Sequence, residues 1–423
     1  MDRYFYLQNP WWENITFDTG IIRYNYVDQL EKSINQRLIQ ILTGLRRVGK
    51  STIARQLVHL LINKKKVNPK KILFFSIEEP SISKTPIINI VNEFRSEHGI
   101  KSNTKIYVFI DEIQFRENWQ QEIKSLYDTE NIKFILTGSS AMLLSKKLSY
   151  LTGRYLKTQV FPLSFKEYLD FKKVKTIKVD RFLLAKHTES FFIDGGMPEY
   201  VLYKPDRYLQ TTIESILFKD LVSKFKLRAP QILTELIYLL SDRVGSTSSS
   251  LKLSKILEIN KDTVLTYLDY LNKTFITSEL SNYSTSRNKE IYNPSKIYFE
   301  DTGVCNTYSS KTNYGALAEN AIYNHLKKQL TEELRVKLGY WYENKNEIDF
   351  VIKKGNNKYL IESKWVDRID EIKSFNVLEK LKSIKKIFYI TRTLKSKITI
   401  YSHKVEFIPL HEFLIDNINV YIN

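Results

Sequence analysis

The residues with the clearest chemical meaning lie in the stretch ILTGLRRVGKST, near the N-terminus. They follow the pattern G-x-x-x-x-G-K-[ST], in which backbone N–H groups converge on the phosphates of a nucleoside triphosphate. The lysine of this pattern reaches the β and γ phosphates, and the hydroxyl that follows it ligates Mg²⁺. We expect ATP contacts from Gly44, Arg47, Val48, Gly49, Lys50, Ser51, Thr52 and Asp111.

Two carboxylates, Asp111 and Glu112, follow the apolar run 107–110. Such a run predicts a buried parallel strand, and open α/β sheets bind ligands at the carboxyl ends of their strands. Asp111 would hold Mg²⁺ through water, and Glu112 would orient or deprotonate the water that attacks the γ phosphate. The same pair could instead begin a helix, since acidic residues are common at N-caps. The phosphate loop upstream favours ATP hydrolysis.

A second group of charged residues lies between 315 and 364. The stretch 315–330 predicts an amphipathic helix with Ile322, Leu326 and Leu330 on its buried face. Glu319 lies on the same face, where a carboxylate costs free energy unless it is paired or metal-bound. This position indicates that Glu319 has a partner.

The segments 347–352 and 359–365 predict a β-hairpin. A two-residue turn at Gly355 and Asn356 places Asp349 opposite Glu362, and a turn shifted by one residue places Asp349 opposite Lys364. Any even-length turn leaves these three side chains on one face. Together with Glu319 they predict a Mg²⁺ site beside a cation, or else a surface hairpin with salt bridges.

The elements around the phosphate loop predict how these residues are positioned. Apolar, β-rich runs alternate with helical patterns, which indicates a parallel sheet with helices on both faces. The runs are 38–42, 72–77, 106–110, 133–137 and 156–161. One strand separates the loop from the Asp-Glu strand, which is typical of P-loop ATPases with strand order 5-1-4-3-2. Thr137 or Ser139, at the end of 133–137, would sense the γ phosphate, unless Ser139 is only a turn residue.

Five segments in this order resemble the archaeal and bacterial AAA+ ATPases with a C-terminal nuclease-like domain. They are GLRRVGKST, FIDEIQFRENW, ILTGSSAMLL, LTGRYLKTQVFPLSFKEY and GGMPEY, and NPWW at Asn9–Trp12 fits the archaeal members. The resemblance covers essentially the whole chain and implies that Arg154 faces the γ phosphate. Such an arginine is often supplied by a neighbouring subunit, which would make the protein a homo-oligomer (a ring). Arg154 could also pair within its own subunit. Trp11 and Trp12 would pack against the sheet or stack on a base.

The carboxylates of the hairpin resemble the D…(E/x)-x-K core of restriction-endonuclease-like nucleases. This resemblance implies that Asp349 and Glu362 bind Mg²⁺, that Glu319 completes the site, and that Lys364 positions or activates the attacking water. The proline that precedes the aspartate in those nucleases is missing here.

We predict four domains: an ATPase core (1–165), a helical lid (166–240), a winged helix-turn-helix (241–305) and a restriction-endonuclease-like α/β domain (306–423). In the third, 251–257 and 262–271 read as a helix pair, with Val264, Leu268 and Leu271 toward the core. Winged helices bind DNA through the outward face of the second helix or dock onto proteins. The outward residues, and candidate DNA contacts, are Lys261, Thr263, Thr266 and Tyr267.

Composition places limits on these predictions. The 423 residues carry a net charge of +18, which favours a polyanionic partner such as DNA. The single cysteine, Cys305, excludes an intramolecular disulfide, and no apolar run approaches the length of a membrane span. We therefore expect a soluble, cytoplasmic protein.

Three functions fit this sequence. The favoured one is an ATP-hydrolysing AAA+ protein that acts on DNA with a Mg²⁺-dependent nuclease-like domain. The second is a nucleotide-controlled switch whose nuclease-like domain is an inactive scaffold. The third is a helicase-like or transposition-related DNA motor without cleavage.

Overall fold

The computed structural model describes most of the chain, in eleven stretches. These are residues 1–138, 148–175, 181–222, 230–247, 249–284, 294–331, 333, 335–343, 346–372, 375–379 and 383–422. The chain forms two compact units, Met1–Val160 and Phe161–Asn423. Each unit is described by itself below. Among the described helices, none has both the length and the apolar composition needed to cross a membrane.

The N-terminal unit is built on a five-stranded parallel sheet in the order β2-β3-β4-β1-β5. The strands are β1 (Ile39–Thr43), β2 (Ile72–Ser76), β3 (Ile106–Asp111), β4 (Ile132–Gly138) and β5 (Tyr155–Gln159). Read from the other edge, this order is 5-1-4-3-2, so the predicted topology is confirmed. β1 is buried throughout, as expected for a strand covered on both faces.

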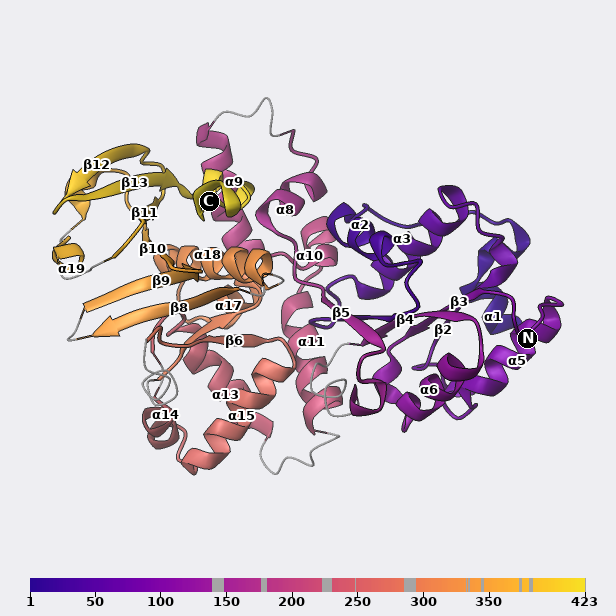
Figure 1. Cartoon of the computed structure of the whole chain (residues 1–423). Helices are drawn as coiled ribbons and strands as arrows, with labels where there is room; N and C mark the ends of the chain where they lie inside the picture. The colour runs from indigo at the N-terminus through magenta and orange to yellow at the C-terminus, as the bar shows by residue number, and fades with distance from the viewer. Residues whose placement is uncertain are drawn as a thin grey trace. The chain divides into compact units, whose positions relative to one another are not determined.

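Helices cover both faces of this sheet, with α2 and α3 on one side and α6 on the other (Figure 1). The helices are α1 (Arg3–Gln8), α2 (Tyr24–Lys32), α3 (Lys50–Asn63), α4 (Pro80–Ser83), α5 (Ile87–Glu97) and α6 (Trp119–Thr129). The amphipathic pattern predicted after residue 118 forms α6, which buries Trp119, Ile123 and Leu126.

The NPWW segment covers the edge strand β2. The Asn9 side chain forms a backbone-like pair with Phe74, because its Oδ1 accepts from the Phe74 N–H at 2.6 Å and its Nδ2 donates to the Phe74 carbonyl at 2.7 Å. Trp11 and Trp12 both donate their indole N–H to the Ile72 carbonyl, at 3.2 and 2.8 Å. Both rings are buried, so these tryptophans pack against the sheet. The segment blocks an edge that could otherwise pair with another chain.

The C-terminal unit begins with helices and a two-stranded hairpin. Its first helices are α8 (Phe165–Phe171), α9 (Arg181–Asp194), α10 (Pro198–Tyr203), α11 (Tyr208–Ser215), a π-helix (Ile216–Val222), α13 (Pro230–Ser241), α14 (Ser250–Ile256) and α15 (Lys261–Lys273). β6 (Thr277–Leu280) pairs antiparallel with β7 (Lys296–Phe299), and Thr247 bridges to Lys296.

The Gly-Gly turn after α9 has a packing explanation. Gly195 has φ +70°, and a Cβ there would lie 2.1 Å from Asp301 Oδ1. The Gly196 N–H donates to Asp301 Oδ2 at 2.6 Å. The glycines of GGMPEY therefore let the backbone meet a buried carboxylate.

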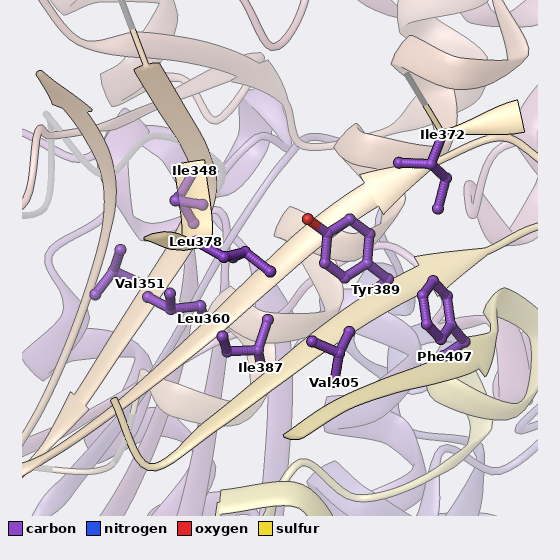
Figure 2. Packing of buried hydrophobic residues seen from close by; sticks show 9 residues of the cluster. All are labelled: Ile348, Val351, Leu360, Ile372, Leu378, Ile387, Tyr389, Val405 and Phe407. Atoms are coloured by element: carbon purple, nitrogen blue, oxygen red, sulfur yellow. The ribbon is translucent and has the colours of Figure 1, made fainter. Parts of the chain in front are cut away.

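A six-stranded mixed sheet, in the order β12-β13-β11-β10-β9-β8, completes the unit. Its strands are β8 (Val336–Glu343), β9 (Asn346–Lys354), β10 (Asn357–Lys364), β11 (Lys386–Thr391), β12 (Ser396–Ile400) and β13 (His403–Pro409). The accompanying helices are α17 (Thr302–Tyr308), α18 (Tyr314–Leu330), α19 (Asn376–Glu379), α20 (Leu410–Ile415) and α21 (Asn419–Ile422). Figure 2 shows the apolar cluster on this sheet, which includes Ile348, Val351, Leu360, Tyr389 and Phe407.

Candidate functional site

The phosphate loop joins β1 to α3, as its spacing predicts. Gly44 has φ +149° and Gly49 has φ +96°, a backbone region that glycine adopts without a steric penalty. A Cβ on Gly44 would lie 2.2 Å from the Val160 carbonyl oxygen. Arg47 is exposed and has φ +62°. Because α3 begins at Lys50, the N–H groups of its first turn are directed toward the loop.

The Lys50 side chain is buried behind this loop. Its ammonium donates to the carbonyls of Gly44 and Leu45, at 3.3 and 3.0 Å. Charged phosphate oxygens are stronger acceptors than these carbonyls. Lys50 could therefore donate to the phosphates of a bound nucleotide instead of to the two carbonyls. Thr52 is exposed on the first turn of α3.

Arg23, which the sequence patterns did not single out, supports the loop. It is 4% exposed, and its Nη1 donates to the Val48 carbonyl at 3.1 Å. The Arg23 backbone N–H donates to Gln56 Oε1 at 3.1 Å. Gln56 Nε2 in turn donates to the carbonyls of Thr19 and Ile21. The segment before β1 therefore braces the phosphate loop. An arginine outside any motif gives no local signal of this contact.

Asp111 faces Ser51 across the end of the sheet. The Ser51 hydroxyl lies 2.8 Å from each Asp111 carboxylate oxygen. The Thr137 hydroxyl also donates to Asp111 Oδ1 and accepts from the Glu112 N–H at 3.1 Å. Burial raises the pKa of Asp111, as does the charge of Glu112, and the hydroxyls of Thr137 and Ser51 oppose this. The first turn of α3 and the ends of β3 and β4 thus meet at one carboxylate.

These side chains fit Mg²⁺. A hydroxyl and a carboxylate that face one another are the hard oxygen ligands this ion prefers. Ser51 and Asp111 would hold it, as the sequence predicts, and it would supply charge neutralisation at the phosphates.

Glu112 lies just beyond β3 in a left-handed conformation, with φ +53°. Its carboxylate accepts a hydrogen bond from the Gln114 side-chain amide, a contact that the sequence patterns did not indicate. Of the two proposed phosphate sensors, Thr137 contacts Asp111 directly. Ser139 lies outside the described residues.

Arg154 precedes β5, which runs parallel to β1 with Ile39 opposite Tyr155 and Thr43 opposite Gln159. The phosphate loop follows Thr43, so Arg154 lies at the other end of the strands, about 16 Å away along the sheet. Its Nε lies 3.4 Å from Asp128 Oδ1, in α6. Within its own unit, Arg154 therefore points away from the phosphate loop.

The predicted hairpin is present, with its turn at Gly355 and Asn356. Asn357 pairs with Lys354, and the ladder continues to Ile361 opposite Phe350. It ends one step before Asp349 and Glu362. The pairing of β8 with β9 contains a β-bulge. Gly339 pairs with Val351 and Trp341 pairs with Ile348, so one residue of β8 lies opposite two residues of β9. A bulge of this kind redirects a side chain, and Asp349 lies within it.

Glu319, Glu347 and Asp349 surround the ammonium of Lys296, and we call these four residues the carboxylate cluster. Lys296 Nζ lies 2.6 Å from Glu347 Oε1, 3.0 Å from Glu319 Oε1 and 3.2 Å from Asp349 Oδ1. Burial alone lowers the pKa of Lys296, but the three carboxylates raise it overall. Sequence reasoning missed Lys296 and Glu347. The signal available for Lys296 was a lysine directly before the apolar, β-rich run 297–299.

Other groups also donate to carboxylate oxygens of the predicted metal site, whereas Glu362 Oε1 is buried and accepts no hydrogen bond from the described residues. Tyr298 donates to Glu319 Oε1 at 2.7 Å, and the Ser363 N–H donates to Asp349 Oδ2 at 2.9 Å. Lys364 donates to Glu362 Oε2 at 2.6 Å. Burial raises the pKa of both Glu319 and Glu362, and the charge of Asp349 adds to this.

These residues do not fit the Mg²⁺ site that the sequence predicts. Within the described ranges, no group of three or more acidic, histidine or cysteine side chains is arranged to hold a metal ion. The place between Glu319 and Asp349 is taken by Lys296. Asp349, Glu362 and Lys364 do lie together, since Lys364 Nζ is 3.9 Å from Asp349 Oδ2 and 2.6 Å from Glu362 Oε2, but Lys296 pairs with both Glu319 and Asp349 in the place predicted for the metal.

The helix pair expected at 251–271 forms α14 and α15. Val264, Leu268 and Leu271 are buried, as predicted. Tyr267 is also buried, at 6% exposure, so the expectation that it faces outward is wrong. It lies three residues after Val264, on the same helical face. Lys261 and Thr266 are exposed and Thr263 is half-buried.

Comparison with known proteins agrees with the geometry of the nucleotide site. Residues 36–169 match the AAA domain family, residues 185–314 match a domain of unknown function (DUF8612), and residues 314–413 match another (DUF4143). The first match agrees with the phosphate loop and supports an AAA+ P-loop domain at residues 36–169.

Similar proteins occur in bacteria and archaea. An uncharacterized protein of Haemophilus influenzae is 29% identical over 349 residues, which are 79% of this chain and 84% of that protein. Two uncharacterized proteins of Methanocaldococcus jannaschii are each 28% identical, over 74% and 77% of this chain and 72% and 74% of their own lengths.

Two solved structures of DnaA align with part of the chain. The replication initiator DnaA bound to AMPPCP and single-stranded DNA has a TM-score of 0.31 and 14% identity, over 63% of this chain and 92% of that one. AMPPCP-bound DnaA from Aquifex aeolicus has a TM-score of 0.29 and 12% identity, over 62% and 90%. TM-scores this low assign neither a fold nor a ligand to this chain.

Proposed function

We propose that the N-terminal unit binds and hydrolyses ATP. The observation that carries this proposal is that the hydroxyls of Ser51 and Thr137 meet the Asp111 carboxylate beside the phosphate loop, while Thr137 also accepts from the Glu112 N–H. Backbone N–H groups and Lys50 would bind the phosphates, and Ser51 and Asp111 would hold Mg²⁺. Glu112 would orient the attacking water, with its position set by Thr137 and Gln114.

Glu112→Gln tests this assignment, because the amide keeps the size of the side chain but is not a base. Hydrolysis should fall by about 10²-fold or more while ATP affinity stays within a few-fold of wild type. Phosphate release and equilibrium binding of ATP measure the two effects. Equal turnover by the variant and the wild type would show that Glu112 does not orient the attacking water.

We propose further that Arg154 acts on the nucleotide of a neighbouring subunit. This is supported by its place at the end of β5 opposite to the phosphate loop, where it cannot serve its own nucleotide. The proposal requires a homo-oligomer, which the mixing experiment in the Discussion tests.

For the C-terminal unit we propose a nucleotide-controlled switch in which the nuclease-like sheet is a scaffold. The ion pairs of Lys296 with Glu319 and Asp349 favour this over a Mg²⁺-dependent nuclease. Purified protein should leave single-stranded, duplex and branched DNA intact with Mg²⁺ or Mn²⁺. If the wild-type protein cleaves DNA and Asp349→Ala does not, the nuclease function would be supported instead of the scaffold.

DNA binding through a winged helix is a second candidate function for this unit. It is supported by the net charge of +18 and by α13–α15 followed by the β6–β7 hairpin, with Lys261 exposed on α15. Lys261→Glu should weaken DNA binding and lower the salt dependence by about one counterion. Tyr267→Phe is the control, because Tyr267 is buried and should not alter affinity. Equal binding by Lys261→Glu would point to protein docking instead.

A further inference from the structure

The carboxylate cluster contains a cation that belongs to the chain itself. A lysine ammonium has three N–H donors. In Lys296 each can reach a different carboxylate, at 2.6 Å from Glu347, 3.0 Å from Glu319 and 3.2 Å from Asp349. The Lys296 side chain is 1% exposed, and a buried ammonium is tolerated only when it is paired in this way.

The surroundings of Glu319 leave it little freedom to turn toward another ion. Its Oε1 accepts from both Lys296 and Tyr298, which belong to the same strand, β7. Gly245 has φ +77°, and a Cβ there would lie 2.8 Å from the same oxygen. Backbone and side chains thus close around the ion pair.

We propose that Lys296 takes the place of a divalent metal ion at Glu319, Glu347 and Asp349, so that the C-terminal sheet binds no metal while Lys296 remains there. The lysine comes from the 185–314 region and the carboxylates from the 314–413 region. The ion pairs of the carboxylate cluster therefore also connect the β6–β7 hairpin to the C-terminal sheet. This inference rests on the scaffold function proposed above and names the residue responsible for it.

The wild-type chain provides the first test. Mn²⁺ binding to the nucleotide-free protein, measured by electron paramagnetic resonance, should be the same for wild type and Asp349→Asn. A Mn²⁺ site in the wild type that disappears in Asp349→Asn would overturn the proposal, whatever the behaviour of other variants.

Lys296→Met provides the second test, because it removes the charge but keeps much of the side-chain volume. Without their cation, the buried Asp349 and the half-buried Glu319 should lower the melting temperature by about 10 °C. The variant should gain a Mn²⁺ site, and Mn²⁺ should restore part of the lost stability. Adding Asp349→Asn should remove that site.

Lys364→Met is the matched control. Its ammonium pairs with Glu362 at 2.6 Å and is 3.9 Å from Asp349 Oδ2, and its side chain is 37% exposed. It should gain no Mn²⁺ site. Lys296→Met that folds but binds no Mn²⁺ would defeat this inference and leave the scaffold function standing. Asp349-dependent DNA cleavage by the wild type would defeat the scaffold function itself.

Discussion

At the residue scale, Thr137 connects the Asp111 carboxylate to the backbone of Glu112, because its hydroxyl donates to Asp111 and accepts from the Glu112 N–H. Thr137→Val keeps the shape of the side chain but breaks both contacts. We expect ATP turnover to fall by about 10- to 100-fold, with little change in ATP affinity, because the geometry of Glu112 is disturbed and the phosphate loop is not. Steady-state hydrolysis and equilibrium binding together measure this.

Thr43→Val is a matched control for Thr137→Val. Thr43 is buried at the end of β1, and within the described part of the chain its hydroxyl has no hydrogen-bond partner. Replacing it with an apolar side chain of the same shape should be nearly neutral. If both variants lost activity equally, the loss would come from packing at the strand ends and not from the Thr137 contacts.

Asp301 predicts a pH-dependent stability. It is buried against the Gly196 and Val304 N–H groups, and burial raises its pKa from 3.8 to about 6. A raised carboxyl pKa stabilises the folded state below pH 3.8, and this stabilisation is lost as the pH rises through 6. The unfolding free energy of wild type minus that of Asp301→Asn should therefore fall by about 2 kcal/mol between pH 4 and pH 7. Urea denaturation measures it, and a difference that is independent of pH would show that Asp301 does not titrate in this range.

At the element scale, Asn9 should protect the edge of β2. Asn9→Ala removes the partner of the Phe74 N–H and carbonyl, and a buried group left unpaired costs about 1–3 kcal/mol. We expect lower stability of the N-terminal unit and faster hydrogen exchange at the Phe74 amide. Glu13→Ala, at the exposed end of the same 3-10 turn, is the control. Unchanged exchange at Phe74 would mean that the edge is covered by Trp11 and Trp12 alone.

The N-terminal sheet was predictable because its signals are local. Apolar runs gave each strand to within about two residues, and the order of the loop and the Asp-Glu strand gave the topology. The turn at Gly355 and Asn356 was predictable for the same reason. Lys296 was not, because its contacts with Glu319 and Asp349 depend on tertiary packing and on a bulge in β9. The division of 161–423 into lid, winged helix and nuclease-like domain stays a prediction.

At the scale of the whole molecule, the position of Arg154 predicts complementation between subunits. Arg154→Ala and Lys50→Ala should each be nearly inactive, since an arginine of this kind contributes about 10³-fold or more to turnover. Mixed together, they should recover part of the wild-type hydrolysis, because an intact Arg154 can meet an intact phosphate loop at a shared interface. Absence of recovery in a mixture shown to exchange subunits would place Arg154 outside the reaction.

The central claim is that residues 44–51 hold the triphosphate of ATP. Calorimetric titration of a non-hydrolysable ATP analogue, with Mg²⁺, tests it most directly. The wild-type protein should bind one analogue per chain, and Lys50→Ala, folded but without the ammonium, should bind at least about 10-fold more weakly. The claim would be contradicted by a wild-type protein that binds no analogue, or by Lys50→Ala with unchanged affinity.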